Sequence, residues 1–81
     1  MHETLDDPVD VIVAFKNNRV LPRRLQWNGN TYDIETINMV HTVREGKHRV
    51  FYFSVSDKAN NFKLRLDPQH LEWRLIELYT P

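Results

Sequence analysis

Hydrophobic and polar residues alternate along most of the chain, whereas apolar spacing typical of a helix is scarce. Alternation with a period of two is typical of β-strands that bury one face. The pattern predicts six strands, at Val9–Phe15, Arg23–Trp27, Thr31–Val43, His48–Ser56, Asn61–Leu66 and Leu71–Tyr79. Short segments rich in Asn, Gly, Asp and Pro separate these strands, and connections this short join antiparallel neighbours. We therefore predict an all-β fold, a six-stranded antiparallel meander.

The lengths of the connections predict which residues lie opposite one another. Loops at 28–31, 57–60 and 67–70 and a turn at 45–46 bring apolar side chains to one common face, which specifies the register strongly. The predicted pairs include Leu25 with Ile34, Val40 with Phe51, Phe53 with Leu64, and Leu64 with Trp73. A flat sheet of this size cannot bury such a face, so we expect it to curl into a small barrel or half-barrel.

The last predicted strand also has a helical interpretation. Asp67 and Pro68 have the chemistry of a helix N-cap and first position, and leucines follow at helical spacing. Leu71, Trp73 and Leu75 nevertheless alternate and complete the inner face that the other strands form. We favour the strand.

The outer face of the predicted sheet carries an apolar patch, defined as Ile37, Met39, Val43, Val50 and Tyr52. The patch has three interpretations. The N-terminal segment, or Ile76 and Leu78, could cover it; a β-bulge near Thr36 could rotate the strand; or the patch could bind a protein partner or a second copy of the chain.

The same face carries a basic cluster, defined as Tyr52, Lys63, Arg65 and Arg74. An aromatic ring among cations is typical of a stacking platform for single-stranded nucleic acid, so the cluster is a candidate nucleic-acid-binding site. Its alternative interpretation, which we favour, is a solvated sheet face with an ion pair between Arg65 and Glu72.

The formal net charge of zero, from 11 Lys and Arg against 11 Asp and Glu, hides an uneven distribution. Four of the acids lie in residues 1–10, which contain no Lys or Arg. We expect residues 1–8 to be an acidic N-terminal lead-in and residues 9–81 to form a single β domain. The lead-in is interpreted as a solvated end, or alternatively as an acidic strip that shields the basic body.

Residue types that carry chemistry are sparse. The 81 residues contain no Cys, and two glycines cannot form a phosphate loop. Among four histidines, His41 and His48 could be neighbours, but no third metal ligand can be placed. We therefore expect no enzymatic activity, no catalytic residues, no metal and no cofactor, in a cytoplasmic protein without a membrane partner.

Three segments together resemble a known family: Asp7–Val11 at the start, Trp27–Ile34 in an early hairpin and Trp73–Tyr79 at the end. The order resembles small bacterial domains of unknown function that occur alone and at the C-terminus of inactive Y-family-polymerase-like mutagenesis proteins. The resemblance implies an all-β fold and transfers no catalytic residue. The chain departs from the family around His41 and 46–48, where members have a tryptophan-containing segment.

These observations predict a non-catalytic binding module. We expect a protein-interaction or self-association module that uses the outer-face apolar patch, with an unknown protein or a second copy as its partner. The alternative is an accessory module that binds single-stranded nucleic acid through the basic cluster.

Overall fold

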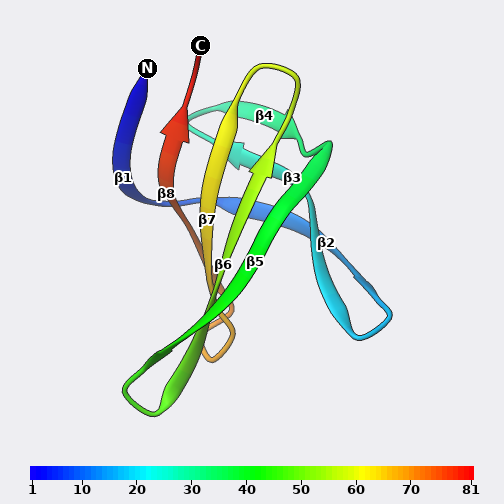
Figure 1. Ribbon diagram of the computed structural model, residues 1–81, viewed down its shortest axis with the longest axis vertical. Helices are drawn as coiled ribbons and strands as arrows, with labels where there is room; N and C mark the ends of the chain where they lie inside the picture. The colour runs from blue at the N-terminus through cyan, green and yellow to red at the C-terminus, as the bar shows by residue number, and fades with distance from the viewer.

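The computed structural model describes residues 1–81 and contains eight β-strands and no helix. The strands are β1 (His2–Pro8), β2 (Asp10–Lys16), β3 (Arg19–Trp27), β4 (Asn30–Asp33), β5 (Thr36–Glu45), β6 (His48–Ser56), β7 (Asn61–Asp67) and β8 (Glu72–Tyr79). They form a five-stranded sheet, in the order β1-β8-β7-β6-β5, and a three-stranded sheet, in the order β2-β3-β4, which crosses one of its faces (Figure 1). No segment forms a helix that could cross a membrane.

The all-β antiparallel prediction is confirmed, but the six-stranded meander and its closure into a barrel are wrong. The predicted lead-in forms β1, which pairs with β8 at the edge of the large sheet. The predicted strand Thr31–Val43 divides at Ile34 and Glu35, where the chain passes between sheets. The N–H of Ile34 donates to Arg23 in the small sheet, and the N–H of Glu35 donates to Ser56 in the large one. No Gly or Pro marks this corner in the sequence, and hydrophobic–polar alternation continues through it. The pattern therefore predicted one strand where the structure has two.

Two-residue turns set the hairpin registers. Asn28 and Gly29 both have positive φ, 53° and 79°, as a type I′ turn requires, and at 46–47 only Gly46 does, with φ 62°. The first turn is tighter than the predicted loop at 28–31, and the second lies one residue later than the predicted turn at 45–46. Consequently Leu25 lies opposite Tyr32, and Val40 lies opposite Phe53. Each shift is two residues, so the side chains keep their predicted face.

The segment Glu72–Tyr79 forms the strand β8, as we favoured over a helix. Its register with β7 differs from the predicted one. The predicted pair of Phe53 with Leu64 is confirmed. Leu64, however, lies opposite Leu75 rather than Trp73, because the connection from β7 includes Leu71 in a left-handed conformation with φ 54°.

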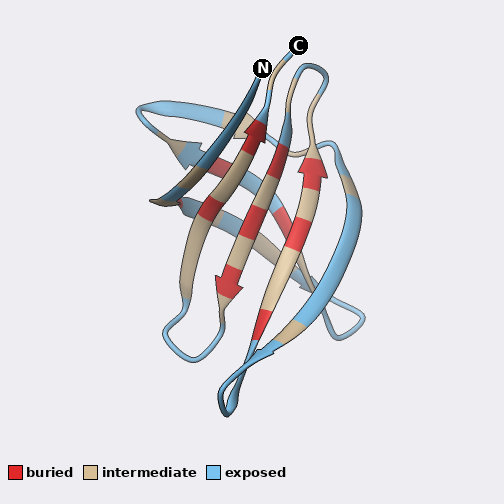
Figure 2. Cartoon of the chain, turned by 60° about the vertical axis from the view of Figure 1, so that its left-hand side comes forward, coloured by how far each residue is buried: buried red, intermediate tan, exposed pale blue.

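The core lies between the two sheets. Its most buried side chains, each exposed by 2% or less, are Leu25, Phe53, Val55, Phe62, Leu64 and Leu75. All but Leu25 come from β6, β7 and β8, where the buried segments concentrate, whereas β5 is mostly exposed (Figure 2). Trp73 packs 5.3 Å from Phe53, and Tyr32 packs 5.2 Å from Phe62, between ring centroids.

A side-chain hydrogen bond joins the two sheets. Nε1 of Trp27, at the end of β3, donates to Oδ2 of Asp7 in β1 over 2.9 Å. Asp7 lies opposite Leu75, so its carboxylate is on the core side of the large sheet. The bond brings together two of the three segments that carry the family resemblance, and it gives both residues a structural role.

Two aspartates fold the connections at the ends of β7. The carboxylate of Asp57 accepts from the N–H groups of Ala59 and Asn60, at 2.8 and 2.7 Å. Burial opposes ionisation, but these bonds outweigh it and hold the pKa of Asp57 below its usual value. The hydrogen bond with His70, at 2.8 Å, and the backbone bond from Gln69 lower the pKa of Asp67.

We expect the fold to lose stability as the pH falls below about 4, the ordinary pKa of an aspartate. Because both pKa values are lower in the folded state, the unfolded chain binds protons first. The stabilisation is therefore complete above the unfolded pKa and disappears as the pH falls through the folded one. Urea midpoints measured from neutral to acidic pH should fall more for the wild type than for Asp57→Asn. An equal fall in both proteins would contradict this role for Asp57.

Candidate functional site

The structure brings the residues of the basic cluster together on the outer face of the large sheet. Tyr52 lies opposite Arg65, and Arg65 lies opposite Arg74, in three adjacent strands. Lys63 follows on the same face of β7, because residues two apart on a strand share a face. The four residues therefore share one face, as expected, but Arg74 lies opposite Arg65, where the sequence analysis expected Glu72.

The charges of this cluster are nevertheless neutralised within the molecule. The ion pairs are Arg65 with Glu45 at 2.7 Å, Lys63 with Glu77 at 3.9 Å, and Arg74 with Asp6 and with Glu72, each at 3.4 Å. The bond from Glu45 raises the pKa of Arg65. Asp6 belongs to the acidic N-terminal segment, which therefore supplies one of these partners. The predicted pair of Arg65 with Glu72 does not form; Glu45 reaches Arg65 instead.

The ring of Tyr52 also has partners inside the molecule. His41 stacks on it, with ring centroids 5.3 Å apart and an interplanar angle of 15°. Nζ of Lys63 lies 5.3 Å from the ring centroid, and the hydroxyl donates to Glu45 over 3.4 Å. A base would have to displace these contacts before it could stack on Tyr52.

The outer-face apolar patch does not form as a continuous surface. The register of β5 shifts between Ile37 and Met39, which lie opposite Val55 and Ser54 and leave Asn38 as an extra residue. Ile37 therefore packs against the core, and its predicted position on the outer face is wrong. This is the β-bulge interpretation, with the bulge two residues beyond Thr36.

The remaining patch residues are dispersed. Val50 is only 2% exposed, and Val43 opposite it is half-buried. The contact of Glu45 with Arg65 joins β5 to β7, so it passes over β6, which carries Val50 and Tyr52. Met39 alone is widely exposed. The chain ends do not cover this region, since β1 lies at the opposite edge of the sheet and Leu78 belongs to the core.

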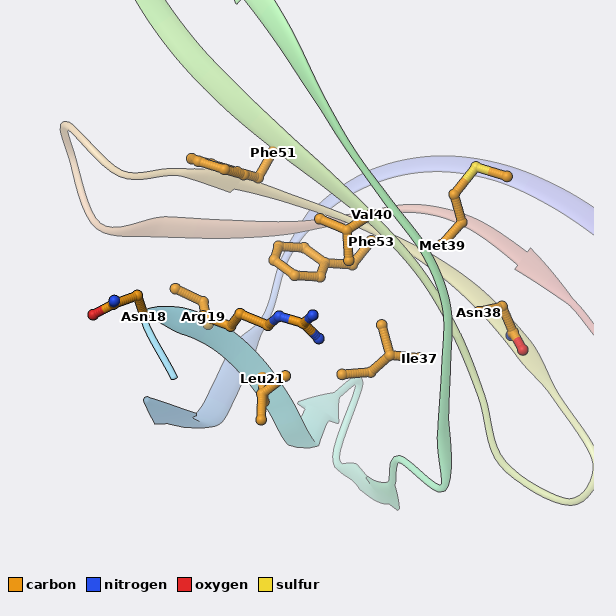
Figure 3. Close-up of a pocket in the computed structure, with 10 residues that line it drawn as sticks. Asn18, Arg19, Leu21, Ile37, Asn38, Met39, Val40, Phe51 and Phe53 are labelled. Atoms are coloured by element: carbon orange, nitrogen blue, oxygen red, sulfur yellow. The ribbon is translucent and has the colours of Figure 1, made fainter. Parts of the chain in front are cut away.

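The exposed apolar surface lies instead between the two sheets, in a cleft of about 500 Å³ that we call the inter-sheet cleft. Its apolar lining comes from β3 on one side and from β5 and β6 on the other: Val20, Leu21, Ile37, Met39, Val40, Phe51 and Phe53. Ile37 points into it and Arg19 reaches toward it, whereas Met39 points to the other side of β5 (Figure 3). The small sheet has three strands and the large sheet has five, so the small sheet leaves this part of the inner face of the large sheet uncovered.

The cleft continues onto a free strand edge. β5 is the longest strand and is hydrogen-bonded to β6 alone. Val40, exposed by 49%, stands on β5 at the rim of the cleft. An unpaired edge offers backbone N–H and C=O groups to another strand.

The two edges of the large sheet differ in how they are protected. β1 carries Pro8, three acidic residues (Glu3, Asp6 and Asp7) and a pairing irregularity between Thr4 and Asp7, and such features discourage strand addition.

 

β5 has no proline and no charged residue before Arg44, apart from His41 when it is protonated. Its one irregularity, between Ile37 and Met39, precedes Val40. Most of β5 is therefore open to pairing.

Sequence reasoning placed three of the residues that line this cleft on the correct face but did not predict the cleft. Val40, Phe51 and Phe53 were placed on the inner face, and they do lie there. The pattern gave no sign that β2, β3 and β4 form a separate, narrower sheet, and that is what leaves these side chains uncovered. No signal in the sequence marks how far the small sheet extends, so the cleft could not be found from the pattern alone.

The geometry includes no metal centre, since no group of three or more His, Asp or Glu side chains lies close enough together to hold an ion. Searches against protein-family models, curated proteins and solved structures find no match to this chain. The resemblance to the bacterial domain family stays a prediction, and the case for a function rests on the geometry.

Proposed function

We propose that the chain is a non-catalytic protein-interaction or self-association module that binds through the inter-sheet cleft and the free edge of β5. The observation that carries this proposal is the continuity of an apolar cleft with an unpaired strand edge. In strand addition, the backbone edge supplies hydrogen bonds and adjacent pockets take alternate side chains. The cleft and β5 offer both.

The alternative, an accessory module for single-stranded nucleic acid at the basic cluster, has less support. Nucleic-acid binding depends on cations that are free to neutralise phosphates. Lys63, Arg65 and Arg74 each have a carboxylate partner, so phosphates would compete with ion pairs that already exist. Protein interaction requires no such exchange.

Replacing Val40 with asparagine is expected to weaken binding by tenfold or more, about 1.4 kcal/mol, because the amide removes apolar contact at the cleft. Two measurements check this: sedimentation over a range of concentrations for self-association, and selection from a displayed library of short peptides for partner binding. Ile12→Asn is the matched control, since Ile12 in β2 is also an exposed β-branched residue and does not line the cleft.

The control variant should bind like the wild type. A wild-type protein that stays monomeric and selects no peptide would refute the proposed function. Equal losses in the two variants would refute the assignment of binding to the cleft.

A further inference from the structure

Three arginines near the inter-sheet cleft have no carboxylate partner. Arg19 lines the cleft itself, and Arg44 and Arg49 lie at the end of the β5–β6 hairpin. None of them takes part in any ion pair of the molecule. This contrasts with the basic cluster on the outer face, where every cation has a partner.

Arg44 and Arg49 lie directly opposite each other across the hairpin. Like charges in this position destabilise a pair of strands. Arg49 is two residues from Phe51 on β6, so both residues are on the face that lines the cleft. The cleft therefore has an apolar floor and an uncompensated positive charge beyond one end.

The inner face of β5 has a direction. Beyond the bulge it presents Val40, then Thr42, then Arg44, at alternate positions. A strand added antiparallel to β5 begins opposite Arg44 and ends opposite Val40. Its inward-facing side chains therefore meet a cation first and the apolar cleft afterwards. Every strand pair in the molecule is antiparallel, and that pairing is slightly the more stable.

We propose that β5 and the inter-sheet cleft bind an extended segment of another protein, in which an acidic residue is followed at alternate positions by two apolar residues. The acid lies against Arg44 and Arg49, the apolar side chains enter the cleft, and the segment's backbone pairs with β5. This inference rests on the proposed function and names the class of partner.

Fluorescence anisotropy with labelled synthetic peptides tests the proposal. The probe is a threonine–serine peptide in which one glutamate is followed at alternate positions by valine and leucine. The comparison peptides carry lysine in place of glutamate, or the same residues in reverse order. The glutamate peptide should bind at least about tenfold more tightly than either, and added salt should weaken it.

Arg49→Glu separates binding from folding. This change replaces a repulsive cross-strand pair with an attractive one, so the thermal midpoint should rise while affinity for the glutamate peptide falls. The lysine peptide should bind Arg49→Glu more tightly than it binds the wild type. Lys58→Glu is the matched control, because Lys58 is an exposed, unpaired cation in the loop at the other end of the sheet, and it should leave the peptide preference unchanged.

The outcomes distinguish this inference from the proposed function. Peptides that bind alike regardless of charge or direction would overturn the inference and leave the function standing. A dimer that Val40→Asn dissociates, with no peptide bound, would do the same and identify a second copy as the occupant. A thymidine oligonucleotide that displaces the glutamate peptide from the wild type and also binds Val40→Asn undiminished would overturn the inference in favour of nucleic acid. A monomer that binds nothing would overturn both.

Discussion

Replacing Phe53 with alanine is expected to lower the thermal midpoint by about 15 to 30 °C, the largest single-residue effect in the molecule. Phe53 is 1% exposed and packs against Trp73 in the centre of the core. Removing a buried phenylalanine destabilises a protein by about 3 to 5 kcal/mol, through lost burial and the cavity that remains. A domain of this size has a total stability of roughly 4 to 12 kcal/mol.

Thermal unfolding followed by circular dichroism measures the effect, and Phe51→Ala provides the comparison. Phe51 is on the same face of β6 but is only half-buried at the cleft, so its loss should cost much less. Phe53→Leu should lie between wild type and alanine, because it keeps part of the volume. Equal losses at 51 and 53 would mean that the small sheet covers both, contrary to the cleft described above.

The sequence predicted the core because its constraint is local. Phe53 and Leu64 pair as expected through the loop at 57–60, and the two-residue shifts elsewhere preserve the inner face. Hydrophobic–polar alternation along a strand has a period of two residues, so a register shift of two residues leaves each side chain on the same face. It therefore identifies which residues are buried more reliably than which residues are neighbours.

The division into two sheets could not be predicted in the same way. At Ile34 and Glu35 the chain changes sheets through hydrogen bonds to Arg23 and Ser56, residues far away in the sequence. The pairing of β1 with β8 likewise joins the two ends of the chain. These contacts depend on the assembled fold, and the local pattern carries no trace of them.

The residues predicted to form the outer-face apolar patch lie apart in the structure for the same reason. Alternation placed Ile37 and Met39 on one face, but the extra residue at Asn38 separates them. The residues of the basic cluster share a face as expected, but their neutralisation depends on Glu45 and Asp6, which reach them from the end of β5 and from β1. The cleft required knowledge of how far the small sheet extends.

Replacing Asp7 with alanine is expected to destabilise the fold by about 1 to 3 kcal/mol, because it removes the acceptor of the Trp27 indole N–H between the two sheets. The indole is half-buried, so water cannot fully replace Asp7 as the acceptor of its N–H group. Asp10→Ala is the matched control: Asp10 is exposed, lies just beyond β1 and makes no side-chain hydrogen bond or ion pair, so its loss should change stability by less than about 0.5 kcal/mol.

A double-mutant cycle with Trp27→Phe isolates the bond, since phenylalanine keeps most of the apolar contact and lacks the donor. Urea unfolding of the four proteins should give a coupling energy of about 1 kcal/mol or more between positions 7 and 27. Once Trp27 has become phenylalanine, removing the Asp7 carboxylate should cost little, because no donor is left unpaired. Strictly additive effects would show that the two sheets are held together by apolar packing alone, and that Asp7 contributes to β1 without linking it to β3.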